Sequence, residues 1–156
     1  MKTIILLLLC IPFTANGFLV NEYKGIPVEH NRYGCGEWNE HFNMCYHWNE
    51  NKITVQEYNL ERNYFFDLSH EYAHPLYRNT LTQAQRDIWE DVSTGKYDTW
   101  LESHWVDTSI EYFSDYAKKD IEEDFSETYG ATQHYTFPSV KTKLWFKMRL
   151  VEYFTN

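Results

Sequence analysis

Residues 64–75 read YFFDLSHEYAHP, and the organisation of the whole chain can be worked out from this stretch. Apolar side chains recur there every three or four positions, which is the spacing of one face of an α-helix. The spacing predicts a helix over about 62–75. Three side chains with metal-site chemistry, His70, Glu71 and His74, lie in its second half.

These three residues form a His-Glu-x-x-His pattern. Two imidazoles four positions apart share one helical face, so His70 and His74 can both reach a single Zn²⁺. Glu71 lies about 100° round the helix, beside the metal. From there it can take a proton from water and pass it to a leaving amine. The alternative is a histidine pair with an incidental glutamate, because motifs this short also arise by chance.

A zinc site of this kind needs a third protein ligand and an open position for water. Apolar spacing predicts a helix over 108–124, and Glu111 and Asp115 would share one of its faces. Glu111 would bind the metal while Asp115 holds a ligand histidine through its free ring N–H. Alternatively, Thr108 and Glu111 form a capping box, which gives Glu111 a structural role. The acidic residues in 120–124 would end this helix, an unfavourable place for its dipole.

The two segments together resemble the lethal-factor-like zinc metallopeptidases. This family includes the catalytic domain of anthrax lethal factor and the secreted proline–proline endopeptidases. Its second segment is of the Glu-Phe-Phe-Ala-Glu type, which residues 111–115 match in order and character. The resemblance covers about residues 50–150 and implies a zincin-like metallopeptidase domain. By that likeness the zinc ligands would be His70, His74 and Glu111.

Two positions depart from the family. The resemblance makes Glu71 the base and places a tyrosine seven residues before the ligand glutamate, where it helps to stabilise the oxyanion; here that residue is His104. A histidine can donate the same hydrogen bond, or it can be an ordinary residue beside a helix. The second departure is Pro75, which removes an amide and disfavours a helical backbone at His74. A helix that ends or kinks at His74 would misdirect its imidazole, as in a catalytically weak or inactive relative.

A competing third ligand is Asp107. With the aromatic residues that follow it, Asp107 resembles the ligand aspartate of the asp-zincins such as deuterolysin. The Gly-Thr-x-Asp-x-x-Tyr-Gly segment of that group is absent from the sequence, so Asp107 ranks behind Glu111. Either carboxylate would complete a site of two histidines and one acid.

The remaining patterns predict an α+β domain that is mainly helical, with a small sheet and an active-site helix. Residues 18–52 are rich in glycine and asparagine and are expected to form loops. Residues 53–58 alternate apolar and polar side chains and include β-branched ones, which predicts a strand.

Two further helices are expected. One covers 80–93, where Thr80 and Gln83 form a capping box and Gly95 stops the helix. The last covers 139–153 and takes its first residue, a serine, as its N-cap. Both segments carry apolar residues at helical spacing.

The start of the chain has the layout of a secretory signal peptide. A single positive charge precedes an apolar run that is too short to span a bilayer, and small residues mark a cleavage site. We therefore expect residues 1–17 to be a signal peptide and residues 18–156 to form a single domain. Of the three cysteines one belongs to the signal, and Cys35 and Cys45 would form a disulfide in an oxidising compartment.

Composition limits the possible partners. A net charge of −9 over 156 residues argues against nucleic acid or an anionic membrane. A hydrophobic content of 43% argues against disorder. We expect a secreted, monomeric metalloendopeptidase that uses Zn²⁺ to hydrolyse a peptide or protein substrate. The alternatives are a secreted binding protein that keeps the zincin fold without turnover and an asp-zincin-type peptidase.

Overall fold

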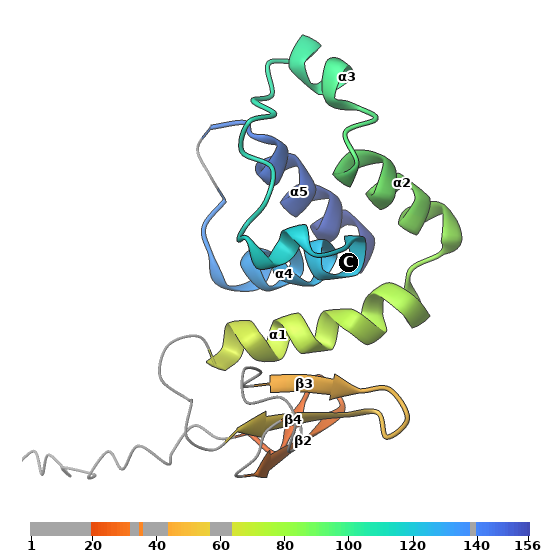
Figure 1. Cartoon of the computed structure of the whole chain (residues 1–156), viewed down its shortest axis with the longest axis vertical. Helices are drawn as coiled ribbons and strands as arrows, with labels where there is room; N and C mark the ends of the chain where they lie inside the picture. The colour runs from red at the N-terminus through yellow and green to blue at the C-terminus, as the bar shows by residue number, and fades with distance from the viewer. Residues whose placement is uncertain (1–19, 32–34, 36–43, 57–63, 138–139) are drawn as a thin grey trace, which may run out of the picture.

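The computed structural model describes residues 20–31, 35, 44–56, 64–137 and 140–156. In this part of the chain a four-stranded sheet lies at one end and helices form the rest (Figure 1). Helix α1 (Tyr64–Pro75) lies between the sheet and the other helices. The predicted class, α+β and mainly helical with a small sheet, is confirmed. The zincin-like identity of the domain stays a prediction.

The sheet is mixed, with the strand order β1–β2–β4–β3. The strands are β1 (Glu22–Tyr23), β2 (Ile26–Asn31), β3 (Met44–His47) and β4 (Lys52–Gln56). Strands β2 and β4 run parallel, and β1 and β3 pair antiparallel at the two edges. The strand predicted over 53–58 is confirmed as β4 for the residues that the structure describes, and residues 57–58 lie outside them.

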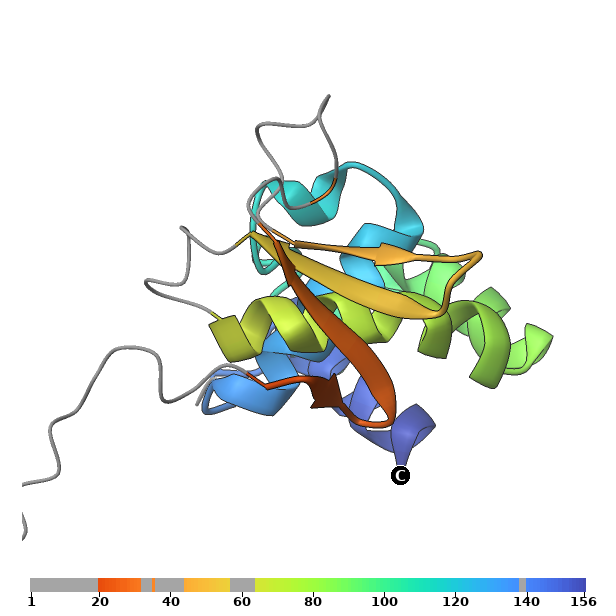
Figure 2. The same ribbon diagram turned by 90° about the horizontal axis from the view of Figure 1, so that it is seen from below.

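Helix α1 is buried on two sides. The strands lie across it on one side, and the later helices cover the other (Figure 2). Leu68 is fully buried in the apolar cluster of the sheet, and Ala73 is fully buried in the cluster of the later helices. The helix predicted over 62–75 is confirmed from residue 64 onward, and residues 62–63 lie outside the described chain.

Pro75 does not break the helix before His74. It is the last residue of α1, with φ −64° and ψ −31°, and the chain continues as a π-turn over Leu76–Thr80. The backbone N–H of Leu81 donates to the carbonyl of Leu76 at 3.1 Å, which closes this wider turn. The helix therefore continues through His74, because proline, whose φ is fixed near the helical value, is accommodated where the wider turn begins.

Helix α2 (Gln83–Ser93) begins at a capping box, but not at the predicted one. The hydroxyl of Thr82 accepts from the backbone N–H of Gln85 at 3.3 Å, and the Gln85 side chain accepts from the backbone N–H of Thr82 at 2.8 Å. The predicted box on Thr80 is wrong because Thr80 belongs to the π-turn, which delays the start of the helix.

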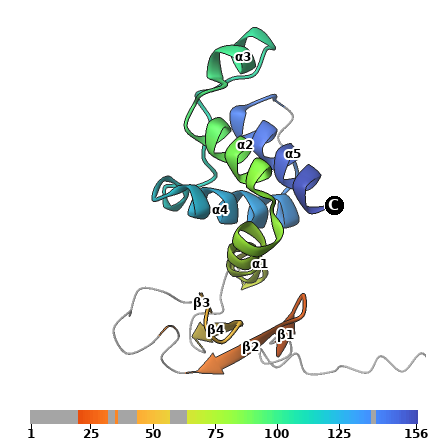
Figure 3. The ribbon, with the colours of Figure 1, turned by 90° about the vertical axis from the view of Figure 1, so that its right-hand side faces the viewer.

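Gly95 ends α2 and separates it from the short helix α3 (Asp98–Ser103). Its φ is +86°, a left-handed conformation that glycine adopts without a steric penalty, so the predicted stop is confirmed. Helix α3 lies at the end of the molecule opposite the sheet (Figures 1 and 3).

The helix predicted over 108–124 is wrong. An irregular segment leads to a single 3-10 turn, η2 (Tyr116–Lys118), and helix α4 (Ile121–His134) follows. Asp120 sets the boundary, because its Oδ1 accepts from two backbone N–H groups of the first turn, both at 2.9 Å. The acidic residues that follow it begin a helix rather than end one, which is where the helix dipole stabilises them.

Helix α5 (Lys143–Thr155) also begins later than predicted. Thr142 is its N-cap and accepts from the backbone N–H of Trp145 at 3.0 Å. The predicted span of 139–153 is thus shifted, and the expected cap, Ser139, lies outside the described residues. Helix α4 lies between α1 and α5 (Figure 3).

Helices α1 and α4 approach each other closely at Gly130. A Cβ atom at this position would lie 2.9 Å from Cε2 of Phe66, which is closer than carbon atoms normally pack. The close contact fixes the separation between the side chains that the two helices direct at each other.

The predicted disulfide between Cys35 and Cys45 is confirmed. The predicted signal peptide, residues 1–17, lies outside the described residues and stays a prediction. Among the helices that the structure describes, none has both the length and the apolar character needed to cross a membrane.

Candidate metal centre

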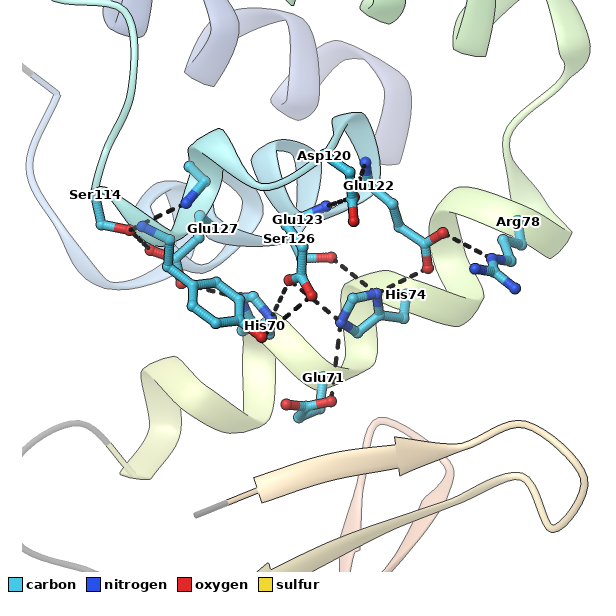
Figure 4. Close-up of polar contacts among 12 residues, drawn as sticks. His70, Glu71, His74, Arg78, Ser114, Asp120, Glu122, Glu123, Ser126 and Glu127 are labelled. Carbon is cyan, nitrogen blue, oxygen red and sulfur yellow. Dashed lines mark hydrogen bonds and ion pairs between the residues drawn. The ribbon is translucent and has the colours of Figure 1, made fainter. Parts of the chain in front are cut away.

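Polar side chains of α1 and α4 meet between the two helices (Figure 4). His70 and His74 stand one turn apart on α1, and their ring centroids are 5.1 Å apart. Glu122, Glu123 and Glu127 reach them from the first two turns of α4. The prediction that the two imidazoles share one helix face is confirmed. His70, Glu71 and His74 form a group that could hold a metal ion, with one ligand atom from each within 4.8 Å of the others.

Glu123 joins the two imidazoles. Its Oε2 lies 3.1 Å from Nε2 of His70 and 3.8 Å from Nε2 of His74. This oxygen is buried, and it forms an ion pair with His70 when that imidazole is protonated. A buried carboxylate is costly unless a cation neutralises it.

The separations of these three atoms suit a bound metal ion. Zinc binds imidazole nitrogen and carboxylate oxygen at about 2.0–2.2 Å in a tetrahedral arrangement. Two ligand atoms on such a tetrahedron are therefore about 3.4 Å apart. The observed 3.1 and 3.8 Å lie on either side of this value. The distances from Oε2 of Glu123 therefore suit a carboxylate that shares a metal ion with the two histidines.

The other nitrogen of each imidazole faces a second carboxylate. Oε1 of Glu127 lies 3.0 Å from Nδ1 of His70, and Oε1 of Glu122 lies 2.8 Å from Nδ1 of His74. A carboxylate on Nδ1 orients the ring and leaves Nε2 free to bind a metal. The predicted partner for a ligand histidine was Asp115; in the structure Glu122 and Glu127 occupy that position.

The carboxylates dominate the electrostatics of the site. Burial lowers the pKa of His70, but contacts with Glu123 and Glu127 outweigh it and raise this pKa to about 10. Burial would raise the pKa of Glu123, but its contact with His70 holds it below the ordinary value. In the metal-free protein a proton on His70 therefore offsets the negative charge at neutral pH.

Glu71 lies beside the histidines on the side of the sheet (Figure 4). Its Oε2 is 4.0 Å from Nε2 of His74, and burial raises the pKa of its carboxyl. The carboxylate is thus close to the site but farther from His74 than Glu123 is. This position agrees with the predicted place of Glu71 beside a metal.

A pocket of about 320 Å³ opens at this site between α1, strand β3 and the start of α4. The β3 side contributes Met44, Cys45, Tyr46 and Trp48, and the helical side contributes Glu71, His74, Arg78, Tyr116, Asp120, Glu122 and Glu123; Cys35 also lines it. A mixed polar and aromatic pocket beside clustered ionisable groups is typical of an active site.

Tyr116 places its phenol beside Glu123 and His70. Its hydroxyl donates to Oε1 of Glu123 at 3.2 Å, and its ring lies 5.7 Å from the ring of His70. Burial, followed by the charge of Glu123, raises the pKa of Tyr116, so its hydroxyl keeps its proton at neutral pH.

Glu123 and Tyr116 are not among the predicted site residues, although the sequence carries a signal for them. Tyr116 stands seven residues before Glu123, and Glu127 stands four residues after it. That is the spacing expected around Glu111, moved twelve positions along the chain. The aromatic residue inside 123–127 agrees with the same pattern.

No family model, curated protein or solved structure matches this chain. The resemblance to lethal-factor-like metallopeptidases therefore stays a prediction. Evidence for function comes from the geometry of the α1–α4 site.

The structure does not bring Glu111 or Asp115 to the histidines. Oε1 of Glu111 lies 2.6 Å from Nζ of Lys143, and Asp115 is exposed and paired with Lys118 at 2.6 Å. Because residues 111–115 are not helical, the two carboxylates do not share a face. The proposed capping box does not form either, since the hydroxyl of Thr108 donates to Glu102 at 2.7 Å.

His104 and Asp107 also lie apart from the pocket. His104 ends α3, where its ring is 4.2 Å from that of Trp100, and α3 is separated from α1 by α4 and α5 (Figure 1). Asp107 is exposed, and its Oδ1 accepts hydrogen bonds from the backbone and hydroxyl of Ser109. Neither residue is among those that line the pocket of the histidines.

Proposed function

We propose that the protein is a zinc metallopeptidase whose metal ligands are His70, His74 and Glu123. The observation that carries this proposal is Oε2 of Glu123, which is buried and lies 3.1 Å from Nε2 of His70 and 3.8 Å from Nε2 of His74. Two imidazoles and one carboxylate are a common ligand set of catalytic zinc. Because imidazole favours zinc over magnesium or calcium, the donor set supports zinc as the resident ion.

Glu71 is the general base in this proposal. When bound, zinc supplies Lewis-acid polarisation of the carbonyl and of the attacking water. The Glu71 carboxylate takes a proton from the water and passes it to the leaving amine. Burial raises the pKa of Glu71 toward the working pH, which suits a group that must take up and release a proton.

Tyr116 replaces His104 as the proposed oxyanion donor. Its hydroxyl is held beside the ligand carboxylate of Glu123 and also lines the pocket. A phenol that stays protonated can donate to the carbonyl oxygen as negative charge develops on it. His104 lies on a different part of the molecule and has no part in this mechanism.

Strand β3 offers a docking edge for an extended peptide. Among the described strands it pairs only with β4, and four residues of the 44–48 stretch line the pocket. An extended peptide can add to such an edge by main-chain hydrogen bonds. A substrate bound along β3 would pass Glu71 and the metal ligands.

We also propose membership of the lethal-factor-like family, now on a corrected set of residues. Residues 123–127, with Tyr116 seven positions before them, fit the family pattern better than residues 111–115. The disulfide between Cys35 and Cys45 supports the further proposal that the protein is secreted, because disulfides persist in oxidising compartments.

The purified protein tests this function directly. We expect it to hold one zinc ion per chain and to cleave members of a diverse peptide library. Glu71→Gln should keep zinc but lower cleavage by about 10²–10⁴-fold, the usual contribution of a general base. A wild type that binds no zinc would rule out the metallopeptidase. A wild type that binds zinc but cleaves nothing would instead favour a binding protein.

A further inference from the structure

Ser114 lies in the irregular segment before η2 and contacts the site through α4. Its hydroxyl donates to Oε2 of Glu127 at 2.6 Å (Figure 4). The other oxygen of that carboxylate, Oε1, lies 3.0 Å from Nδ1 of His70. Glu127 therefore connects Ser114 to the imidazole of His70, which faces the proposed metal position.

The same hydroxyl also organises η2. Its oxygen accepts from the backbone N–H of Tyr116 at 3.1 Å and from that of Ala117 at 3.4 Å. A serine that accepts from N–H groups two and three residues later fixes the backbone of the following turn. The turn carries the Tyr116 phenol to Glu123.

The segment that carries Ser114 is itself held in place. Oε1 of Glu111 lies 2.6 Å from Nζ of the fully buried Lys143, and Nζ of Lys147 donates to the backbone carbonyl of Glu111 at 3.2 Å. These contacts tie the segment to α5 three residues before Ser114. The Ser114 hydroxyl is thus held between these contacts with the buried lysines of α5 and the carboxylate of Glu127.

We propose that Ser114 is a positioning residue that couples the orientation of His70 to the placement of Tyr116. This inference rests on the proposed metal site and deepens it. One hydroxyl donates to the carboxylate that aims His70 and accepts from the turn that carries the oxyanion donor. Removing the hydroxyl releases both groups, whereas an ordinary capping serine would affect only the turn.

Zinc affinity distinguishes these two roles. Ser114→Ala should weaken zinc binding about tenfold, because loss of a partner behind a ligand histidine costs about 10–100-fold. Ser114→Thr keeps the hydroxyl and should restore the affinity of the wild type. Thr82→Ala is the matched control: it removes the cap of α2, whose contacts lie within that helix, and should leave the zinc dissociation constant within about twofold.

The dissociation constants are measured by competition with a chromophoric chelator, and cobalt substitution reports ligand geometry through its visible spectrum. We expect Ser114→Ala to shift the cobalt bands and to lower kcat more than it changes KM. Glu127→Gln leaves the cap of η2 in place and should weaken zinc by a similar factor, which provides a second test if Ser114→Ala unfolds.

The outcomes separate this inference from the proposed function. A wild type that binds no zinc overturns both. A wild type that binds zinc, together with a Ser114→Ala variant whose zinc affinity and cobalt spectrum are unchanged, overturns the role of Ser114 and leaves the metal centre standing. If Ser114→Ala does not fold, unchanged zinc affinity in Glu127→Gln overturns it in the same way.

Discussion

Helix α4 carries buried acids on two faces, and the two faces are neutralised differently. On the α5 side Asp124 is 1% exposed, and its Oδ2 lies 2.5 Å from Nζ of Lys147, which is fully buried. Ser93 donates a further hydrogen bond to the same oxygen at 2.6 Å. On the α1 side Oε2 of Glu123 faces Nε2 of His70 and Nε2 of His74, and its Oε1 accepts from the Tyr116 hydroxyl.

The difference shows why one face is a candidate site and the other is a structural contact. A buried acid must be paired with a cation, because an isolated charge in the interior is costly. The α5 face holds its own cation in Lys147. For Glu123 on the α1 face, the cation is a protonated imidazole or a bound metal ion. A metal ion can replace the proton on His70. The cation of Asp124 is the side chain of Lys147, which cannot be exchanged for a metal ion.

The largest expected effect lies on the α5 face. Lys147→Met should lower the free energy of unfolding by about 3–5 kcal/mol, because it leaves Asp124 buried without its cation. The zinc affinity of the folded protein should change little, since Lys147 lies on the other side of α4 and the ion pair of Glu111 with Lys143 still holds the segment of Ser114. Denaturant unfolding and chelator competition measure the two quantities. Adding Asp124→Leu should recover most of the lost stability.

The next effect lies on the α1 face. Zinc at about 100 times its dissociation constant should stabilise the wild type by about 2.7 kcal/mol, because it binds only the folded state. Glu123→Gln should lose most of this gain, and Lys147→Met should keep it. Thermal unfolding with zinc and with a chelator provides the measurement. If zinc stabilises the wild type and Glu123→Gln equally, the proposed difference between the two faces is contradicted.

The contact between α1 and α4 gives a third prediction. Gly130→Ala should lower stability by about 2 kcal/mol, because the added methyl overlaps the Phe66 ring and overpacked sites cost about 1–3 kcal/mol. It should also weaken zinc, since the clash moves α4 away from His70. Alanine favours a helix over glycine, so a gain in stability would mean that the contact is looser than described.

The pH dependence is expected to be gradual. The pKa of His70 is raised to about 10 in the folded, metal-free protein. A raised histidine pKa stabilises the fold below the unfolded pKa of about 6.5, and this contribution is lost as the pH rises through the folded value. The slope for one proton is about 1.4 kcal/mol per pH unit between about pH 6.5 and 10.

Zinc-loaded protein and the His70→Gln variant should both lack this slope, because neither carries the proton. Denaturant unfolding from pH 6 to 10 compares the three forms. A metal-free wild type with the same pH profile as His70→Gln would show that the carboxylates of α4 do not hold a proton on His70.

Local sequence patterns predicted only part of the fold: residues 18–52, expected to form loops, contain strands β1, β2 and β3. Helix α1 follows from apolar spacing, because Leu68 and Ala73 must be buried on its two sides. The group of His70, Glu71 and His74 follows from that helix. The pairing of Cys35 with Cys45 follows from the number of cysteines in the chain.

The third ligand could not be placed by the same reasoning. Apolar residues at helical spacing run through 108–124, but Asp120 caps a new helix inside this range. Glu111 meets a lysine of α5, Lys143, which lies 32 residues away in sequence. Local patterns carry no information about such a contact, so the sequence placed the proposed third ligand at Glu111 instead of Glu123.

The proposed function requires one metal ion to bind between α1 and α4. A crystal structure of the zinc-loaded protein, with anomalous data at the zinc absorption edge, tests it most directly. We expect one anomalous peak at about 2.0–2.2 Å from Nε2 of His70, Nε2 of His74 and a carboxylate oxygen of Glu123. A peak held by Glu111 or Asp107, or no peak between the two helices, would contradict it.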